Sequence, residues 1–232
     1  MTTRAGHVEE VLRWLERRGT KRNREGMARY GIVANKAFGV SVGTLQQLAR
    51  RLGRDHELAL ALWDTGWYEA RMLTAFVDEP SRVTSRQMDR WARDFDNWGI
   101  CDTVCFHLFD RTPHAWGKVE RWSRSRHEFV KRAAFALLAG LALHDKRAGN
   151  EPFLLALELA PEAVEDERKY VQKGVSWGVR VVGRRNQTLN TAAVEISRKM
   201  AASPHPSARS VGKEALRELT GPLVRRVLAR RG

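Results

Sequence analysis

Two six-residue stretches decide the fold: residues 129–134 read FVKRAA, and residues 170–175 read YVQKGV. Each begins with an aromatic residue and a valine, continues with two long polar residues and ends with two small or β-branched ones. They start 41 residues apart (170 − 129), and helix-pair repeats of the HEAT and armadillo kind recur every ~40 to 47 residues. A third stretch, residues 67–73 (WYEARML), fits the pattern loosely at a different interval. This self-similarity predicts helix pairs that stack on one another.

Helical spacing of apolar residues extends through nearly the whole chain. Apolar side chains that recur every three or four residues mark one face of an amphipathic helix. This spacing occurs at Val8, Val11, Leu12, Leu15, Leu45, Leu48, Ala49, Leu52, Met72, Leu73, Phe76, Ala134, Leu137, Leu138 and Leu141. The alternation typical of a strand occurs only around residues 37–42, and the breaks between helices are single turns rather than linkers. We therefore predict an all-α fold, a superhelical stack of antiparallel helix pairs of the HEAT-like repeat class, in a single domain over residues 1–232.

The charge balance indicates a polyanionic partner. The 232 residues include 41 Lys+Arg and 27 Asp+Glu, a formal net charge of +14 (41 − 27). Residues 166–232 hold fifteen basic and five acidic side chains, a net of +10, whereas residues 1–165 have a net of +4. Such asymmetry is typical of proteins that bind nucleic acid or an anionic membrane surface. On a helical solenoid it predicts a basic concave face that can hold a nucleic-acid duplex.

The composition also indicates the cellular compartment of the protein. Hydrophobic residues make up 43% of the chain and charged residues 29%, as in a globular protein with a proper core. No apolar run approaches the ~18 residues of a membrane span, and the first residues show no signal-peptide core. The two cysteines, Cys101 and Cys105, lie four apart in one expected helix and form no disulfide framework. We expect a cytoplasmic protein without membrane contact, with both cysteines in the core.

Residues 96–105 (DNWGICDTVC) carry the clearest chemistry. Asp96 or Asn97 can cap a helix here, because a short polar side chain accepts a hydrogen bond from a free amide of the first turn. Trp98 and Asp102 are then four residues apart on one helix face, which places an indole beside a carboxylate. The same spacing also fits a Trp98 in the core and an Asp102 in solvent. Spacing alone leaves both interpretations open.

Two further positions combine unusual residue types with a helical setting. Arg132 lies beside Lys131 in a long apolar stretch, where its guanidinium must extend to the surface, pair with a carboxylate or hold a phosphate. Trp177 lies between Gly174 and Gly178, which are four apart on its own helix. Glycine in a helix interior costs ~1 kcal/mol relative to alanine. The two glycines therefore indicate the close approach of either a ligand or a neighbouring helix.

The chain lacks the motifs of several other activities. Cys101, Cys105 and His107 do not form a zinc site, since a structural site needs four ligands and the sequence has no second Cys/His pair. It also has no Walker-type phosphate loop and no dinucleotide-binding glycine motif. We therefore expect no metal and no cofactor. The histidines that we assign to the surface are His56, His114, His144 and His205.

Taken in order, short motifs along the chain resemble the HEAT-like repeat DNA glycosylases of alkylation repair, the AlkD-like family. The resemblance runs from about Phe38 to Arg185. Its motifs are FGVSV at residues 38–42, LQQLA at 45–49, LW at 62–63, YEAR at 68–71, NW at 97–98, CD at 101–102, VKRA at 130–133 and QKGVSWGVR at 172–180. The set in this order is fairly specific for the family.

The resemblance implies a set of site residues. The family's catalytic helix has a tryptophan followed four residues later by an aspartate, which matches Trp98 and Asp102. Its essential arginine matches Arg132, and its second active-site tryptophan matches Trp177. Candidate contacts to DNA phosphates around these positions are Lys131, Lys173, Arg180, Arg184 and Arg185. The sequence departs from the family at Gly99, often acidic in relatives, and at Phe129, often tryptophan, which affects substrate preference more than the reaction.

The implied activity is that of a monomeric DNA glycosylase that removes N3- or N7-alkylated purines, of the 3-methyladenine and 7-methylguanine type, from duplex DNA without extruding the base into a protein pocket. Such a base is already cationic and leaves without a general acid. The enzyme must stabilise an oxocarbenium-like sugar, which Asp102 would do, while Trp98 and Trp177 face the cation and Arg132 holds a backbone phosphate. The protein would be nucleoid-associated when bound to DNA. Two alternatives stay open: a non-catalytic HEAT-like module that binds structured DNA or RNA, and a helical scaffold for protein partners.

Overall fold

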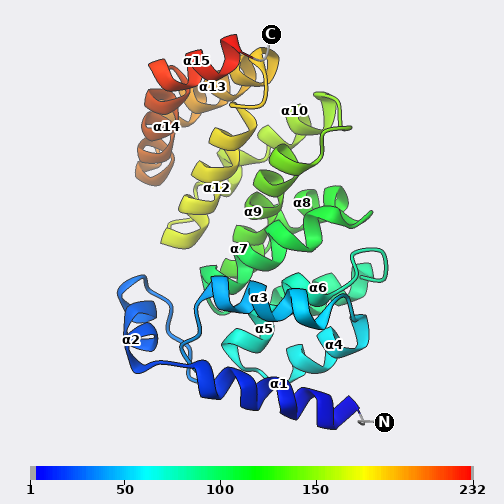
Figure 1. The fold of residues 1–232 in the computed structure, drawn as a ribbon. Helices are drawn as coiled ribbons and strands as arrows, with labels where there is room; N and C mark the ends of the chain where they lie inside the picture. Colours follow the sequence, from blue (N-terminus) through cyan, green and yellow to red (C-terminus); the bar gives the residue numbers. More distant parts are fainter. Residues whose placement is uncertain (1–3, 231–232) are drawn as a thin grey trace.

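The structure, a computed structural model, describes residues 4–230, and within that range it contains helices and no strand (Figure 1). The helices are α1 (Arg4–Arg18), α2 (Lys21–Arg29), α3 (Val42–Leu52), α4 (His56–Asp64), α5 (Tyr68–Val77), α6 (Ser85–Arg93), α7 (Trp98–His107), the 3-10 helix η1 (Phe109–Arg111), α8 (Ala115–Ser123), α9 (Glu128–His144), α10 (Glu151–Leu157), α11 (Ala160–Ala163), α12 (Lys169–Val182), α13 (Gln187–Ala201), α14 (Pro206–Leu219) and α15 (Pro222–Ala229).

The helices form two rows that pack against each other. In the first row α3, α5, α7, α9, α12 and α14 each contact the next member. The second row contains α4, α6, α8, α10 and α13, which pack behind the first (Figure 1). A helix of the first row and its neighbour in the second make one repeat, as α4 with α5 and α13 with α14 show. The predicted all-α stack of helix pairs is confirmed, whereas the basic concave face stays a prediction.

The two stretches that suggested repeats open neighbouring helices of the first row. Residues 129–134 begin α9, residues 170–175 begin α12, and these two helices pack closely together. Val130 and Val171 are both buried, and so are Ala134 and Val175 at the ends of the stretches. The sequence similarity therefore records the same pattern of burial on two equivalent helices.

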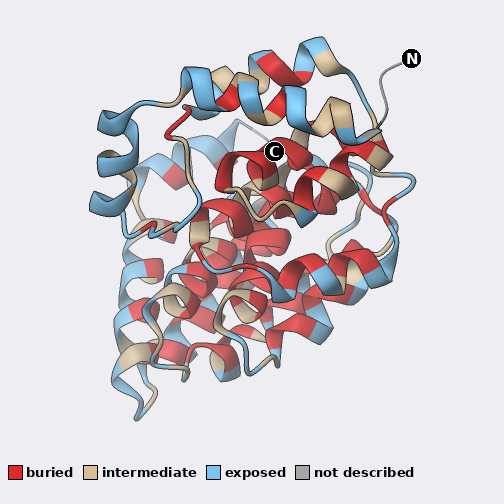
Figure 2. Cartoon of the chain, turned by 90° about the horizontal axis from the view of Figure 1, so that it is seen from below, coloured by how far each residue is buried: buried red, intermediate tan, exposed pale blue. Residues whose placement is uncertain are grey.

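Apolar side chains fill the space between the rows. A continuous cluster of buried residues extends from Val11 to Leu219, and Figure 2 shows the buried positions gathered where the helices face one another. Trp63 and Trp91, from α4 and α6, stack at 4.1 Å within this core. Both cysteines are buried and unpaired, as predicted.

The expected alternation at residues 37–42 does not form a strand. Residues 37–41 belong to the extended connection between α2 and α3, and three of their amides are fixed by one buried carboxylate. The Glu69 side chain accepts hydrogen bonds from the backbone N–H groups of Phe38 (2.9 Å), Gly39 (2.6 Å) and Val40 (3.2 Å). Phe38 also stacks on Trp67 at 3.9 Å. The alternation thus comes from an extended loop pinned to α5 rather than from sheet pairing.

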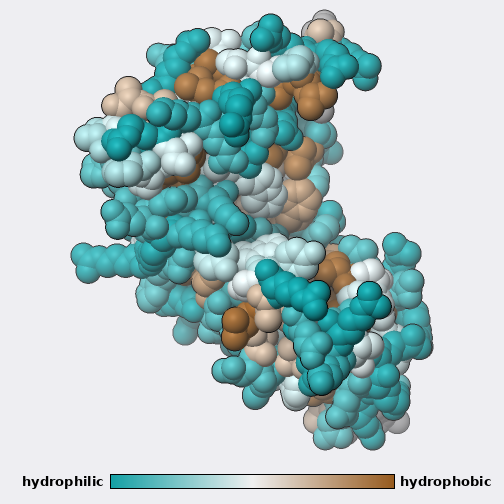
Figure 3. Space-filling view, turned by 90° about the vertical axis from the view of Figure 1, so that its left-hand side faces the viewer, coloured by the Kyte–Doolittle hydropathy of each residue, from teal (hydrophilic) through white to brown (hydrophobic). Residues whose placement is uncertain are grey.

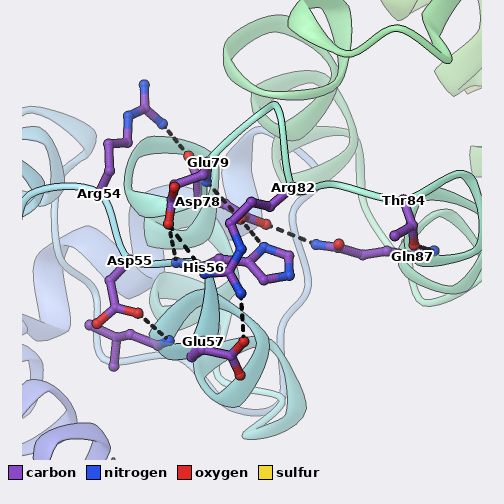
Figure 4. A network of polar contacts seen from close by, with 10 residues as sticks. Arg54, Asp55, His56, Glu57, Asp78, Glu79, Arg82, Thr84 and Gln87 are labelled. Carbon is purple, nitrogen blue, oxygen red and sulfur yellow. Dashed lines mark hydrogen bonds and ion pairs between the residues drawn. The ribbon is translucent and has the colours of Figure 1, made fainter.

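One histidine assigned to the surface is buried. His56, at the start of α4, is 8% exposed, and its Nδ1 lies 2.6 Å from Oδ1 of Asp78 (Figure 4). Gln87 of α6 donates to the other oxygen of Asp78 at 2.8 Å. Burial raises the pKa of the Asp78 carboxyl, and its hydrogen bonds with His56 and Gln87 oppose that rise. The surface assignment of His56 was wrong because the buried carboxylate of Asp78, 22 residues further along the chain, requires polar partners.

The glycines beside Trp177 mark close helix packing rather than a ligand. A Cβ at Gly178 would lie 3.1 Å from the backbone oxygen of Phe135, and one at Gly174 would lie 3.2 Å from Cγ of Arg132. Both neighbours belong to α9. Of the two interpretations that the sequence left open, the structure therefore supports the approach of a neighbouring helix, and this approach sets the position of Trp177 relative to Arg132.

Replacing Gly178 with valine should push α12 away from α9, because the nearest atom is backbone and cannot rotate aside. Overpacking of this kind costs ~1 to 3 kcal/mol, and we expect the free energy of unfolding in urea to fall by that amount. Gly117→Val in α8 is the matched control, since a Cβ there meets no atom within 4 Å, and its effect should stay within ~0.5 kcal/mol. Equal losses in the two variants would contradict close packing at Gly178.

Candidate active site

An open cleft lies where α7, α9 and α12 begin, and the end of α2 forms its opposite wall. Its volume is about 600 Å³. Two of the elements that line it, α2 and the start of α12, lie on the left in Figure 1, and Figure 3 shows that side of the molecule as a mainly hydrophilic surface. The residues that line it are Ala28, Arg29, Tyr30, Gly31, Trp98, Asp102, Arg132, Lys169, Tyr170, Lys173 and Trp177. The structure thus brings together the four predicted catalytic positions and Lys173.

Asp102 and Arg132 form a two-pronged ion pair at this cleft. Nε of Arg132 donates to Oδ1 of Asp102 at 2.8 Å, and Nη2 donates to Oδ2 at 2.7 Å. Nη1 of the same guanidinium donates to the backbone oxygen of Tyr170 at 2.8 Å. The Arg132 and Asp102 side chains are 7% and 19% exposed. Of the three roles that the sequence allowed for Arg132, pairing with a carboxylate is the one present, and it links α7, α9 and α12.

Burial and pairing act on the two charges in different ways. Burial raises the pKa of the Asp102 carboxyl, and the hydrogen bonds and charge of Arg132 oppose that rise. Burial by itself would lower the pKa of Arg132, but the carboxylate of Asp102 raises it above the ordinary arginine value. The arginine is therefore permanently charged. The guanidinium favours the ionised form of the carboxylate because it donates to both of its oxygens.

The two predicted tryptophans line the cleft from different helices. Trp98 opens α7, where Asn97 is the N-cap because its side-chain oxygen accepts from the Ile100 amide at 3.0 Å. The indole Nε1 of Trp98 donates to the backbone oxygen of Tyr30 at 2.9 Å. Trp177 of α12 stacks on Phe106 of α7, with ring centroids 5.9 Å apart. Both indoles are partly buried, so neither is confined to the core.

Sequence reasoning missed the wall that α2 and its following turn supply. The Tyr170 hydroxyl donates to the backbone oxygen of Gly31 at 3.2 Å, which ties this turn to α12. Gly31 has φ of +73°, and a Cβ there would lie 2.5 Å from the Tyr170 hydroxyl. Tyr30 is 74% exposed at the mouth of the cleft. The contact between Tyr170 and Gly31 joins residues 139 positions apart, and no local sequence pattern indicates such a distant pairing.

The side chains predicted to contact phosphates differ in whether they already bind other residues of the protein. Lys173 lines the cleft itself. Lys131 instead forms an ion pair with Asp166, with Nζ 2.9 Å from Oδ2, and Arg168 binds the same carboxylate. The hydrogen bonds from Arg168 hold the pKa of Asp166 well below its usual range.

The three predicted arginines near the end of α12 have partners within the protein. Arg180 and Arg184 both pair with Glu218 of α14. Arg185 donates to three backbone oxygens, those of Ala142, Asp145 and Ala148. These hydrogen bonds from Arg185 tie the end of α12 to the end of α9 and the turn that follows it. A role in DNA binding stays a prediction for all five cations, and for Arg185 it has to be compatible with these internal contacts.

The fold and the cleft define a class: helical-repeat proteins with an open cleft at the starts of three adjacent helices. The chain belongs to the DNA alkylation repair enzyme family, which it matches over residues 11–219. The family places the chain in DNA repair and confirms the family predicted from the sequence motifs. Within residues 4–230, no group of three or more His, Cys, Asp or Glu side chains is arranged to hold a metal ion. None of the helices in that range has the length and apolar character needed to cross a bilayer.

Two similar proteins extend this comparison. The chain is 22% identical over 180 residues to the uncharacterized protein Lin0241 of Listeria innocua serovar 6a, covering 76% of this chain and 73% of that protein. A solved structure superposes with a TM-score of 0.76 and 20% identity over 95% of both chains. That structure represents a new family of proteins related to the HEAT-like repeat DNA glycosylases with affinity for branched DNA structures. At this identity, the likeness establishes the HEAT-like repeat fold.

Replacing Arg132 with methionine should leave Asp102 as a buried carboxylate without a cation. Removing one partner of a buried pair costs roughly 3 kcal/mol, and we expect that loss in the free energy of unfolding at pH 7.5. Burial raises the pKa of Asp102, so the folded variant takes up a proton at a higher pH than the unfolded chain does. The loss should therefore shrink as the pH falls towards 5.

The double variant Asp102→Leu, Arg132→Met is the control for this measurement. It lacks both charges, so its stability relative to the wild type should change little between pH 7.5 and pH 5 compared with the single variant. Urea denaturation at the two pH values measures both. A deficit in the single variant that is the same at both pH values would show that Asp102 does not carry an uncompensated charge there.

Proposed function

We propose that the protein is a DNA glycosylase that hydrolyses the N-glycosidic bond of cationic N3- or N7-alkylated purines, of the 3-methyladenine and 7-methylguanine type, in duplex DNA. The observation that carries the proposal is the single carboxylate, Asp102, held by Arg132 in an open cleft that Trp98 and Trp177 also line. The protein would act as a monomer in the cytoplasm, on the nucleoid DNA, and would need no metal or cofactor.

The proposed chemistry uses one negative charge. An alkylated purine is cationic, so its bond to the sugar is weakened before the enzyme acts. As the bond breaks, positive charge develops on the deoxyribose, and a fixed carboxylate beside it stabilises that charge without reorganising. A carboxylate has about four acceptor positions, and Arg132 occupies two of those of Asp102. The Cys101 thiol also acts on this carboxylate as a hydrogen-bond donor, and a remaining acceptor position can hold the attacking water.

Arg132 then has a positioning role in addition to the predicted phosphate contact. Its guanidinium has five N–H groups, three of which bind Asp102 and the Tyr170 carbonyl. These contacts fix the plane of the Asp102 carboxylate. The remaining two N–H groups are available for a DNA phosphate.

The indoles suit a cationic base that remains close to the duplex. Electron-rich aromatic faces attract a cation by ~0.5 to 2 kcal/mol each, depending on how far it is desolvated. Trp98 and Trp177 line one open cleft with Asp102, rather than a closed pocket around an extruded base. This arrangement supports excision without extrusion, and the hydrogen bond from Trp98 to the Tyr30 carbonyl keeps its ring in place.

The decisive measurement is release of 7-methylguanine from a methylated duplex under single-turnover conditions. We expect the wild type to release the free base and leave an abasic site, and Asp102→Asn to be at least ~10²-fold slower, comparable to losing one preorganised stabilising group. Glu120→Gln, an exposed acid of α8 outside the cleft, is the matched control and should retain the wild-type rate. Duplex affinity should be nearly the same in all three proteins.

Two outcomes would count against this assignment. If the wild type bound the methylated duplex and released no base, the protein would not be a glycosylase for this substrate. If Asp102→Asn kept the wild-type rate, another group would supply the charge. Circular dichroism melting of each variant shows whether a slower rate reflects unfolding, because Asp102→Asn also removes the ionic partner of a buried arginine.

A second candidate is a non-catalytic module that binds branched DNA. Both oxygens of Asp102 are already occupied by Arg132, as in a purely structural ion pair. The superposed solved structure belongs to a family described as having affinity for branched DNA structures. This function predicts at least ~10-fold tighter binding to a four-way junction than to a duplex of equal length at the same salt concentration, with no base release. Equal affinities together with base release would exclude it.

A further inference from the structure

A second cluster of cationic side chains lies at the other end of α7. Arg50 of α3, Phe76 of α5, His107 of α7 and Arg111 of η1 line a cleft of about 430 Å³. His144, at the end of α9, lies beside this cleft, since its ring and that of His107 both contact the ring of Phe106. The catalytic cleft is lined by the starts of α7 and α9, so the two clefts lie near opposite ends of these helices.

A buried carboxylate orients one member of this cluster. Asp110 of η1 is fully buried as a side chain, and its Oδ2 contacts Nδ1 of His144. Its Oδ1 has no hydrogen-bond partner within residues 4–230, and the nearest cation, Nε of Arg111, is 4.0 Å away. Burial raises the pKa of the Asp110 carboxyl, and the His144 imidazole opposes that rise. Because Nδ1 faces the carboxylate, Nε2 of the partly exposed His144 ring remains for a partner outside the chain.

Arg50 and Arg111 carry more positive charge than this one carboxylate balances. The Arg50 side chain makes no hydrogen bond or ion pair with any other described residue, and it lines the cleft with Arg111 and His107. Burial lowers the pKa of His107, and the charges of Arg111 and His144 lower it further. Like charges that converge on one cleft repel each other. An anion bound between them would relieve that repulsion.

We propose that Arg50, His107, Arg111 and His144 form a second phosphate site, which binds a backbone phosphate of the nucleic acid whose other phosphates lie at the catalytic cleft. Arginine recognises phosphate through paired N–H groups, and the imidazole held by Asp110 adds an oriented ring nitrogen. The proposal rests on the nucleic-acid binding proposed above and is independent of base excision.

The spacing of the two sites suits a single duplex. Phe106 joins them: its ring centroid is 5.9 Å from that of Trp177 at the catalytic cleft and 4.5 Å from that of His144 at the second phosphate site. Along α7, the nine residue steps from Trp98 to His107 correspond to ~14 Å at 1.5 Å per residue. Each DNA strand carries a phosphate every ~3.4 Å along the helix axis. A duplex seated at the catalytic cleft therefore has further phosphates within reach of the second phosphate site.

The first test measures how DNA affinity depends on salt. Anisotropy titrations of an unmodified duplex would compare the wild type with Arg50→Gln and with Arg51→Gln, the matched control one residue further along α3 and outside the cleft. We expect Arg50→Gln to weaken binding about three- to tenfold and to reduce the slope of log K against log salt by about 1, because one phosphate contact is lost. Arg51→Gln should match the wild type. Identical behaviour of the two variants would overturn the site.

The second test uses inorganic phosphate and needs neither DNA nor base excision. In NMR titrations of the wild type and of Arg51→Gln, the imidazole signals of His107 and His144 should shift, and Arg50→Gln should need several-fold more phosphate for the same shift. Shifts confined to other histidines, such as His114 and His205, would overturn the proposal. A wild type that shows both the phosphate shifts and the salt-slope change but releases no alkylated base would reject the proposed glycosylase while leaving this site in place.

Discussion

The ion pair between Asp102 and Arg132 is the interaction on which the arrangement of the site depends. Arg132 projects from α9 and binds the carboxylate of α7 and the Tyr170 carbonyl of α12, so one guanidinium sets the relative positions of three first-row helices. Such a pair contributes little net stability, since a well-packed apolar pair of similar volume is often at least as stable. What it does provide is a carboxylate whose plane is fixed by two hydrogen bonds. The Tyr170 carbonyl of α12 can reach Arg132 because Gly174 lets α12 pack directly on that side chain.

A chain of buried polar contacts also builds the wall of the cleft that α2 forms. Glu69 is fully buried in α5, and its carboxylate satisfies three consecutive amides of the extended segment that follows α2. Three hydrogen bonds to one charge are strong enough to fix a loop that has no sheet or helix of its own. The same connection carries Tyr30 and Gly31, whose carbonyls accept from Trp98 and Tyr170. The position of the Trp98 indole therefore depends on a glutamate that does not line the cleft.

The sequence predicted the elements of this structure better than the contacts between them. Apolar spacing and the similarity of residues 129–134 to 170–175 were enough for the helical stack, because each repeat leaves a local pattern of burial. Family motifs led to Trp98, Asp102, Arg132 and Trp177, and the structure places all four at one cleft. Two features depend on how helices distant in sequence pack: the partner of Arg132 and the burial of His56 against Asp78. The turn at Gly31 contacts Tyr170, which lies 139 positions further along the chain, and no periodicity in the sequence predicts such a contact.

The composition of the cleft favours a particular leaving group. Among the described residues that line it, Asp102 is the one carboxyl group, whereas Arg29, Arg132, Lys169 and Lys173 are cationic. These cations suit DNA phosphates, but they oppose a positively charged base. Asp102 is tied to Arg132 in its ionised form, so it is poorly suited to protonate a departing neutral purine. A base that already carries the positive charge needs no such proton, and the indoles offset the surrounding cations by attracting it. Under the proposed function, selectivity for alkylated purines thus follows from the absence of a suitable acid, rather than from a pocket shaped around the lesion.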